Sequence, residues 1–482
     1  MKKYILTLLA VSALMTTSCS DDFLDKVPQK DVSFDQLTDV IKKYPEKSMI
    51  IFGGIEAGNN RFMIDIFAGN SGRHDDFGYM SYQLGLDFMS NDLIQSKSNW
   101  FNIYYNYSGR QETGLATKAQ WTYYYKTIYN MNLIFDIMGN SQEQESLELK
   151  GRALAIRANS YFNLIRIYAN GELGIPYYAK DRGIDNPGRF ATSEVYKNIE
   201  KDLLESYALL ANYSRANKNQ VNKDVVAGVL SRFYLQTKNY SEAAKYAKLA
   251  RANYPLQTDN SSYKGFSDIN NAEWIWGGDI DAVTTTFVAS FFSFMDNRDK
   301  SGYAGGSGTY TLVDKRLYDK ISPTDFRKKW FLGQAEGTMP TYTNVKFYDA
   351  TGSEHTGDYI FMRAAEMYFN EAEALAMSGN EAEARNVLYS LVSTRDPQYK
   401  LSINTGASLL EEIQTQKRIE LWGEGFAFYD MKRWGLPLER KYDGTDHTPA
   451  GTAHNYPAGS SKFIFQIPIA EINNNPIEQN PF

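Results

Sequence analysis

The most informative stretch of this 482-residue chain is RIELWGEGFAFYDMKRWG, residues 418–435. It sets acidic and basic side chains at helical spacing among large aromatic ones. Charges packed among aromatic rings must be paired, because leaving one buried without a partner is costly. The stretch therefore predicts an ion-pair network that closes the fold. The alternative, which the pattern favours less, is an acid/base pair of Glu424 and Asp430. The residues assigned to the network are Arg418, Glu420, Glu424, Gly425, Asp430, Arg433 and Trp434.

Outside this stretch, apolar residues recur at three- and four-residue spacing, which predicts helices. The segments are 117–138, 146–169, 193–212, 224–236, 241–253, 358–377, 381–393 and 408–422. Ser408 and Glu411 predict a capping box at the start of the last segment. Residues 53–114 and 256–350 lack this periodicity and are interpreted as loops, with a short strand at 273–276 and a glycine-rich loop at 302–308. The fold class is mostly α, with few short strands.

Two helix pairs resemble tetratricopeptide repeats, with small residues where paired helices approach closely. The two pairs are centred on Ala243 and Ala384, which lie 141 residues apart, so they do not form one tandem array in the sequence. We expect a helical scaffold with long irregular loop insertions over one face. Loops held by a rigid frame are where binding usually occurs.

The N-terminus has the pattern of a lipoprotein signal peptide. Lys2 and Lys3 precede an apolar run of roughly a dozen residues, which is too short to span a membrane. Cys19 then follows a short small-residue stretch and is the chain's single cysteine, so it has no disulfide partner within the chain. We expect a signal peptide at 1–18, lipidation of Cys19 and a flexible acidic tether at 19–32.

The bulk composition excludes several classes of function. A net charge of −6 and an isoelectric point near 5.5 argue against nucleic acid as a partner. A mean hydropathy of −0.47 leaves no hidden spanning helix. Tyr, Phe and Trp make up 14% of the chain, which suits both helix packing and stacking on sugar rings.

The stretch 418–434 resembles the C-terminal motif of the SusD/RagB family, the outer-membrane nutrient-binding lipoproteins of Bacteroidetes. That motif runs Arg-x-Glu-Leu, Glu-Gly, Asp and Arg-Trp. This chain departs from it at Phe426 and Ala427, where the family usually has His-Arg. Pro468, Glu471-Ile472 and Asn475-Pro476 match a second pattern that family members show near their C-terminus. The resemblance implies a SusD-like region at 33–255 and a SusD/RagB region at 256–482, packed as one body.

By the same resemblance, the protein is a lipid-anchored glycan-binding protein on the outer membrane, facing the cell exterior. It would deliver oligosaccharide or polysaccharide to a SusC-like TonB-dependent transporter, with no catalysis and no cofactor. The alternatives are a peptide-binding protein of the same fold, a surface glycosidase and a pure assembly scaffold.

Two irregular regions combine aromatic rings with polar side chains, as a sugar site requires. They are residues 73–102 and 296–310. The candidate ligand-binding residues are Trp100, Tyr303, Tyr310, Asn91, Asp92, Asn99, Arg73 and Trp330. We assign the remaining tryptophans at helical or strand positions to the core, namely Trp121, Trp274, Trp276, Trp422 and Trp434.

The sequence predicts no metal site. Its four histidines are scattered, and no spacing matches a zinc site. His447 and His454 flank a loop rich in Gly and Pro, so we expect both to be solvated.

Overall fold

The computed structural model describes residues 34–481, apart from 45–46, 179–187, 285–286, 353–354 and 448–453. The predicted signal peptide, Cys19 and the acidic tether therefore lie outside the described residues. The chain divides into two compact units at Gly53 and Gly54. The first contains α2 (Phe34–Lys43) and the start of α3 (Ser48–Phe62), and the second contains the remaining helices and strands.

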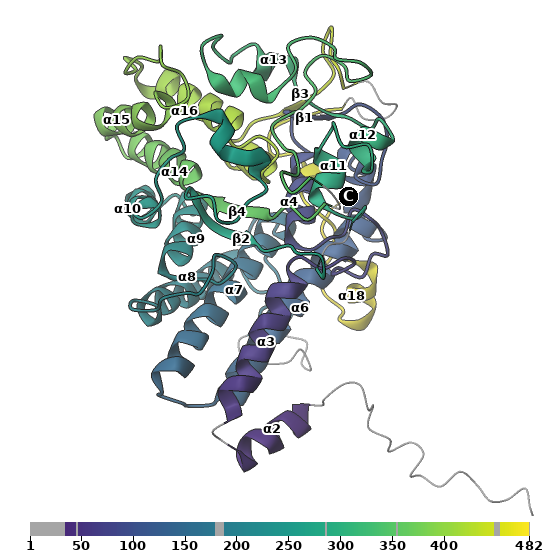
Figure 1. Cartoon of the computed structure of the whole chain (residues 1–482). Coiled ribbons are helices and arrows are strands. Elements are labelled where there is room, and N and C mark those ends of the chain that lie inside the picture. The colour runs from purple at the N-terminus through teal and green to yellow at the C-terminus, as the bar shows by residue number, and fades with distance from the viewer. Residues whose placement is uncertain are drawn as a thin grey trace, which may run out of the picture. The chain divides into compact units, whose positions relative to one another are not determined.

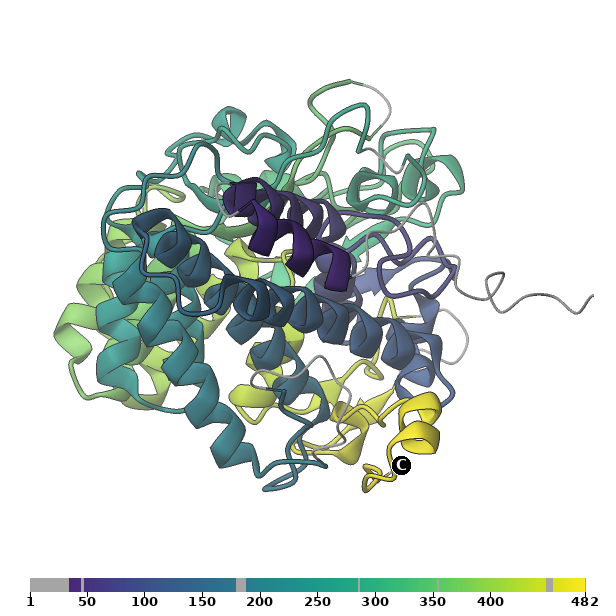
Figure 2. The same cartoon turned by 90° about the horizontal axis from the view of Figure 1, so that it is seen from below.

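Eight helices of the second unit pack one against the next in a continuous stack (Figures 1 and 2). Within this stack, the first predicted repeat pair (α9 and α10) contacts the second (α14 and α15) through α10 and α14. The two predicted repeat pairs are thus neighbours in space although a long insertion separates them in the chain. The helices are α6 (Leu115–Met138), α7 (Gln144–Tyr168), α8 (Thr192–Leu209), α9 (Lys223–Gln236), α10 (Tyr240–Arg251), α14 (Ala364–Met377), α15 (Glu381–Val392) and α16 (Gly406–Glu420).

Small side chains let the helices of each pair approach closely, as predicted. Ala372 of α14 and Ala384 of α15 are fully buried in a core that Phe369, Leu388 and Ile413 complete. None of the helices among the described residues is long and apolar enough to cross a lipid bilayer.

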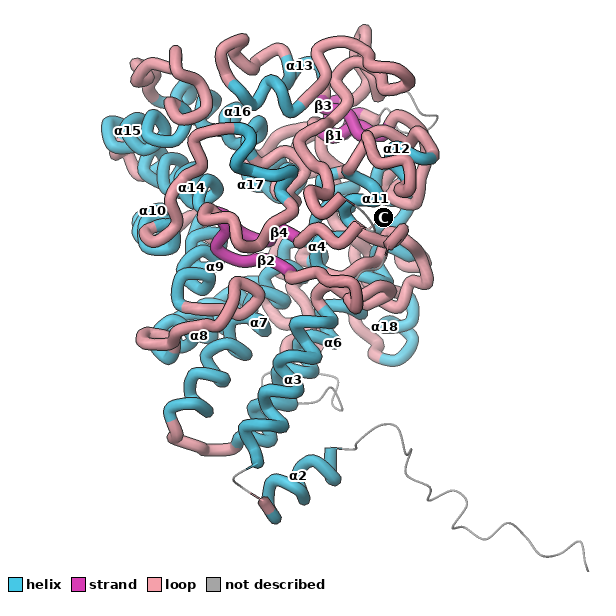
Figure 3. The backbone as a smooth tube through the Cα atoms, viewed as in Figure 1, coloured by secondary structure: helices cyan, strands magenta, loops and turns pink. Residues whose placement is uncertain are grey.

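The loop-rich part of the unit contains short elements (Figure 3). The two-stranded antiparallel pairs are β1 (Leu93–Gln95) with β3 (Thr311–Val313), β2 (Trp274–Gly278) with β4 (Tyr359–Arg363), and β5 (Leu438–Glu439) with β6 (Asn455–Tyr456). The short helices are α4 (Tyr79–Asp87), α5 (Asn102–Tyr105), α11 (Phe291–Met295), α12 (Tyr303–Gly306), α13 (Lys315–Tyr318), α17 (Ala427–Arg433) and α18 (Ile469–Asn474). The 3-10 helices are η3 (Ser108–Arg110), η4 (Asn260–Phe266), η5 (Phe326–Trp330) and η6 (Ser461–Phe463).

Several sequence predictions about local structure were wrong. The region 53–114 is not all loop, because α4 lies within it. Every residue of α4 is buried, so it lacks the polar face that would reveal a helix. Residues 359–363 form β4 rather than the start of a helix, and a short helix occupies 303–306 of the predicted loop. The capping box at Ser408 is absent, because α16 begins at Gly406 after Thr405.

His447 is buried rather than solvated. Its imidazole lies between Tyr105, at 2.6 Å, and the carboxylate of Asp314, at 3.4 Å. Burial lowers the pKa of His447 to about 4, although Asp314 opposes the shift. The residue therefore acts as a neutral hydrogen-bonding group inside the fold.

A buried ion-pair network surrounds Glu420 and Glu424 of the motif, and all of its basic members come from outside the stretch 418–435. Arg363 pairs with Glu420 at 2.7 Å, and with Glu273 and Glu424 at 2.8 Å each. Burial acts to raise the pKa of Glu420 and Glu424, but the surrounding cations outweigh it and lower both values. Four basic residues face four acidic ones within this motif network. Its members are Arg327, Lys346, Arg363, Arg395, Glu273, Asp325, Glu420 and Glu424.

The rest of the motif ties distant parts of the chain together. Arg418 pairs with Asp92, whose carbonyl accepts a 2.8 Å hydrogen bond from the Trp422 indole. Asp87 of α4 accepts backbone N–H groups from Gly425 (2.7 Å) and Ala427 (2.8 Å). These contacts fix the 87–92 turn, and through it the loops that follow.

Two further motif features complete this anchorage. Gly425 has a φ of 92°, and a Cβ there would lie 2.4 Å from the Cβ of Gln83, so only glycine fits. Asp430 pairs with Lys417 (2.9 Å) and Arg433 (2.7 Å). Trp434 differs from its core assignment: it is half-buried and lines a surface cavity.

Candidate ligand-binding site

A row of stacked rings joins the two regions that the sequence analysis selected. His74 stacks on Trp100 with ring centroids 5.1 Å apart, and Tyr303 meets Trp100 edge-on at 6.5 Å. The Tyr303 hydroxyl hydrogen-bonds Nδ1 of His74 at 2.7 Å. Phe67, with 39% of its surface exposed, stacks on His74 at the outer end. We call Phe67, His74, Trp100 and Tyr303 the aromatic row.

The loop before the row is held in a strained shape. Phe67 has a φ of 59°, in the left-handed region that a bulky residue rarely adopts. Asp76 compensates by accepting hydrogen bonds from the backbone of Gly69 and Ser71 and, at 2.6 Å, from the Tyr82 hydroxyl. Such strain at a half-exposed aromatic residue is typical of a binding surface.

Arg73 lies against Trp100 and is paired with Asp75. Its guanidinium is 4.9 Å from the Trp100 ring centroid and donates to the Trp100 carbonyl. The same guanidinium makes a two-pronged ion pair with Asp75, at 2.8 and 3.2 Å. Burial raises the pKa of Asp75 to about 6, against the opposing effect of Arg73. Arg73 therefore orients the Trp100 ring rather than presenting a free cation.

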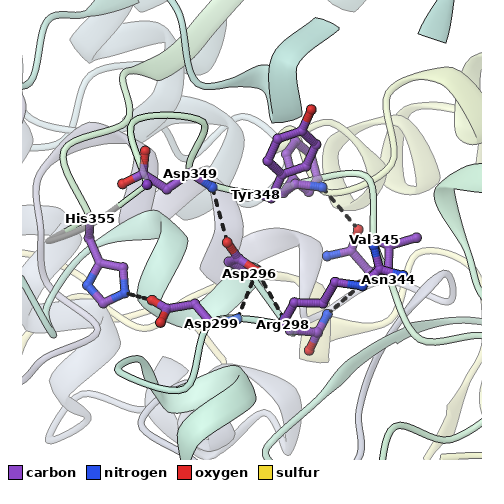
Figure 4. A pocket seen from close by; sticks show the side chains of 11 residues that line it. Asp296, Arg298, Asp299, Asn344, Val345, Tyr348, Asp349 and His355 are labelled. Carbon is purple, nitrogen blue, oxygen red and sulfur yellow. Dashed lines mark hydrogen bonds and ion pairs between the residues drawn. The ribbon is translucent and has the colours of Figure 1, made fainter. Parts of the chain in front are cut away.

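A cavity of about 420 Å³ is lined in part by residues that shortly precede Tyr303 in the chain (Figure 4). Two segments line it, 296–299 and 344–355, and we call it the carboxylate pocket. Its volume falls within the range of small-molecule sites. The lining residues are Asp296, Asn297, Arg298, Asp299, Asn344, Val345, Phe347, Tyr348, Asp349, Gly352 and His355.

Two of the pocket's three carboxylates shape its loops. Asp296 accepts the backbone N–H groups of Arg298 (3.0 Å), Asp299 (3.1 Å) and Asp349 (3.1 Å), as Figure 4 shows, and burial raises its pKa. Asp299 accepts from Ser301 and pairs with His355. Burial acts to raise the pKa of Asp299, but these hydrogen bonds outweigh it and lower the value.

The third carboxylate, Asp349, retains unused acceptor capacity. Its Oδ1 accepts the backbone N–H (2.9 Å) and hydroxyl (2.6 Å) of Thr351. Its Oδ2 is buried and accepts no hydrogen bond from any residue that the structure describes. The neighbouring Tyr348 is 42% exposed. The two residues together offer an aromatic surface beside a hydrogen-bond acceptor.

The aromatic row and the carboxylate pocket are connected through one short segment. Ser301 lies 3.4 Å from Nε2 of His355 in the pocket, and Tyr303 of the row follows two residues later. The backbone N–H of Tyr303 is fixed at 3.2 Å by the hydroxyl of Ser293. The pocket residues Asp299 and His355 are therefore linked to Tyr303 through residues 300–302 of the chain.

Three of the predicted residues have roles in shaping loops. Asn99 accepts the backbone N–H of Phe101 at 2.9 Å and so sets the turn that carries Trp100. Asn91 bonds the backbone of Pro437 and Glu439, and Asp92 is the partner of Arg418. Asn91 and Asp92 line a different cavity, of about 300 Å³, beside the C-terminal motif.

Two predicted platforms are buried. Tyr310 is 5% exposed, packs with Ile94 and Leu312, and shares a 2.5 Å hydrogen bond with Thr338. Trp330 is 2% exposed, and its indole donates to Asn260 at 2.7 Å. Neither ring offers a face to a ligand in this structure, so of the predicted aromatic residues only Trp100 and Tyr303 stay in the candidate site.

The sequence analysis did not identify Tyr348, Asp349 and His355 as site residues. They lie outside both selected regions, and their segment carries no motif. The available signal was the Tyr-Asp pair at 348–349 in a non-periodic stretch, but the same pair also occurs at 318–319, 429–430 and 442–443. Within the described residues, no group of three or more His, Cys, Asp or Glu side chains is arranged to hold a metal ion.

The fold and site define a helical-repeat scaffold that carries a surface site on inserted loops. Two family models match this chain. One, described as "Starch-binding associating with outer membrane", covers residues 74–235, and the other, described as "SusD family", covers residues 332–482. Together they span about two thirds of the sequence. The chain belongs to the SusD family.

Individual relatives agree with this assignment. The SusD-like protein P25 of Formosa agariphila is 22% identical over 464 residues, covering 82% of this chain and 86% of its own. The crystal structure of a SusD-like carbohydrate binding protein from Bacteroides vulgatus is 24% identical, with a TM-score of 0.78 over 89% of this chain and 96% of that one. A laminarin binding SusD-like protein is 20% identical, with a TM-score of 0.67 over 88% and 98%. The two structures show that the fold is shared.

Proposed function

We propose that this protein is a lipid-anchored glycan-binding protein of the outer membrane. It holds oligosaccharide or polysaccharide on the cell exterior and delivers it to a SusC-like TonB-dependent transporter. The binding residues are the aromatic row and the carboxylate pocket, and no catalysis is assigned to them. Family membership and the laminarin-binding relative support a sugar as the ligand.

One observation carries the proposal: Trp100 and Tyr303, 203 residues apart in sequence, meet in one aromatic row, and Tyr303 closely follows the segment 296–299 that lines the carboxylate pocket. Sugar rings present apolar C–H faces and a rim of hydroxyls, so aromatic surfaces beside acceptors match both. The contacts of the pocket carboxylates favour ligand binding over hydrolysis. Asp296 and Asp299 are occupied by backbone N–H groups and His355, which leaves no free acid/base pair of the two.

The direct test is a panel of polysaccharides measured by affinity electrophoresis and calorimetry. We expect at least one neutral polysaccharide to retard the protein and release heat on binding. Trp100→Ala should lower that affinity roughly tenfold or more, which corresponds to about 1.4 kcal/mol. Tyr129→Ala is the matched control, because Tyr129 is 42% exposed on α6, outside the site. No binding to any member of the panel would refute the proposal.

The panel also separates the alternative functions. A peptide library that binds where no glycan does would favour peptide uptake by the same fold. Release of reducing sugar, lost in an Asp299→Asn variant, would identify a glycosidase.

The anchor and the partner need separate experiments. Metabolic labelling with an alkyne fatty acid should label the wild-type protein and leave Cys19→Ala unlabelled. Purification from detergent-solubilised outer membranes should retain a TonB-dependent transporter with the wild-type protein.

A further inference from the structure

We propose that the carboxylate pocket makes this protein a receptor for neutral glycans that discriminates against chains bearing uronate or sulfate groups. The inference rests on the proposed glycan-binding function and names the class of sugar that the same site accepts.

The charge that lines the pocket disfavours an anionic ligand. Asp296, Asp299 and Asp349 face the cavity, whereas Arg298 is the basic residue of its lining. The guanidinium of Arg298 lies 3.3 Å from the carboxylate of Glu336 in an exposed ion pair, which offsets part of its charge. The nearby imidazole of His355 is paired with Asp299. An anionic group entering the pocket would meet carboxylates and a cation that already has a partner.

The adjoining aromatic row offers an anion no better partner. The guanidinium of Arg73 uses Nε and Nη2 on Asp75 and Nη2 again on the Trp100 carbonyl. These contacts leave only Nη1 of Arg73 to donate to an anion. The carboxylate of Asp75, 2.8 Å from Nε of the same guanidinium, offsets its charge and repels an entering uronate.

The second argument is hydrogen-bond chemistry at Asp349. Its Oδ2 is buried and lacks a donor among the described residues, which costs free energy until a donor arrives. A sugar hydroxyl is such a donor. A uronate or sulfate group placed against Asp349 has only acceptors, so it could not pair with Oδ2 and would add like-charge repulsion.

The third argument is the position of Tyr348. This ring is 42% exposed and directly precedes Asp349 in the chain. Gly265 lies under it: a Cβ there would come within 2.7 Å of the Tyr348 ring, so the glycine lets the ring sit low against the loop. An aromatic surface beside a carboxylate acceptor suits the face and the hydroxyl edge of an uncharged pyranose.

The test uses matched glycans that differ only in charge. Amylose, laminarin and mannan are each titrated into the full-length protein before and after oxidation of their primary alcohols to carboxylates. For each neutral glycan that binds, we expect its oxidised form to bind at least roughly tenfold more weakly at physiological salt. Equal or tighter binding of the oxidised form overturns the inference and leaves the proposed function intact.

Anionic polysaccharides distinguish failure of this inference from failure of the proposed function. Polygalacturonate or dextran sulfate binding where no neutral glycan binds also overturns the inference but not the proposed function. Failure of every glycan, neutral or charged, refutes the proposed function itself.

Two variants assign the effect to the pocket. Asp349→Asn should reduce the preference for the neutral form at least about threefold, because it removes one facing charge and supplies an amide donor. Glu411→Gln on α16 makes the same change of net charge outside the pocket and should leave the preference unchanged. An unchanged preference in Asp349→Asn, with the fold intact by circular dichroism, overturns the role given to this residue.

Discussion

The motif network and the carboxylate pocket both gather charged residues, yet they use them in opposite ways. In the network, four acidic and four basic side chains are buried and satisfy one another. In the pocket, carboxylates outnumber cations, and Asp349 keeps an unused oxygen. Balanced charge in the interior fixes one structure, whereas unbalanced charge at a cavity is available to a ligand.

The largest effect is expected from a substitution in the motif network. Glu420→Gln keeps the shape of the side chain but leaves Arg327, Arg363 and Arg395 without their shared carboxylate. We expect a loss of about 3–5 kcal/mol in the free energy of unfolding, measured by urea denaturation.

Glu411→Gln provides the control for that loss on the same helix. Its pair with Lys320 is exposed and 3.3 Å long, so the change should stay within about 0.5 kcal/mol. Equal losses in the two variants would contradict the distinction drawn between buried and exposed pairs.

The second effect concerns Asp87, which joins α4 to the motif. Burial raises its pKa to about 7, above its usual value near 4. The folded state therefore keeps a proton that the unfolded state releases, and the associated stability is lost as pH rises from about 4 to about 7. The free energy of unfolding should fall by up to about 1.4 kcal/mol per pH unit from this group, and Asp87→Asn should abolish that slope.

This prediction is checked by denaturation of both proteins at pH 5, 6 and 7. The other titratable groups are common to both, so the difference between the slopes isolates Asp87. Parallel curves would mean that Asp87 is ionised throughout this range in the folded state.

The third prediction concerns glycan affinity at the carboxylate pocket. Tyr348→Ala removes the exposed ring, and we expect roughly three- to tenfold weaker glycan binding with an unchanged melting temperature. Tyr389→Ala is the matched control, since Tyr389 is 39% exposed on α15 away from the pocket. Calorimetry and thermal scans measure both quantities.

The smallest effect lies in the aromatic row. Tyr303→Phe removes the hydroxyl bonded to His74 but keeps the ring, so the free energy of unfolding should fall by about 0.5–1.5 kcal/mol. Tyr310→Phe also loses a hydroxyl hydrogen bond, in a buried site. We expect Tyr303→Phe alone to weaken glycan binding measurably, by roughly twofold.

Much of the fold was predictable because its signals are local. Along the helices of the stack, apolar residues recur every three or four positions. This periodicity located most of the helix ends to within a few residues, although α14 starts at Ala364 and not at 358. The charged motif indicated that its charges must be paired, but it did not identify the partners. Glu420 and Glu424 pair with cations from positions 327–395, and Arg418 pairs with Asp92. Helix α4 escaped prediction for the opposite reason, because burial on all sides removes the polar face.

The site was predictable only in part. Trp100 and Tyr303 stood out as aromatic residues in polar loops, and they do meet. Trp330 carried a similar local signal but is buried by Tyr263 and Phe266, which the sequence could not place beside it. Tyr348 and Asp349 gain their significance from Asp296, 53 residues away, which no local pattern connects to them.

The clasp between Asp92 and Arg418 joins positions 326 residues apart. A ribosome completes the 87–92 turn, and Trp100 soon after it, long before it makes the residues that hold that turn in place. Helical hairpins can form as they emerge, but the binding surface has to wait for the motif near the end of the chain. A product that stops short of residue 418 lacks the second half of this clasp, so we expect the turn that precedes Trp100 to lose this support.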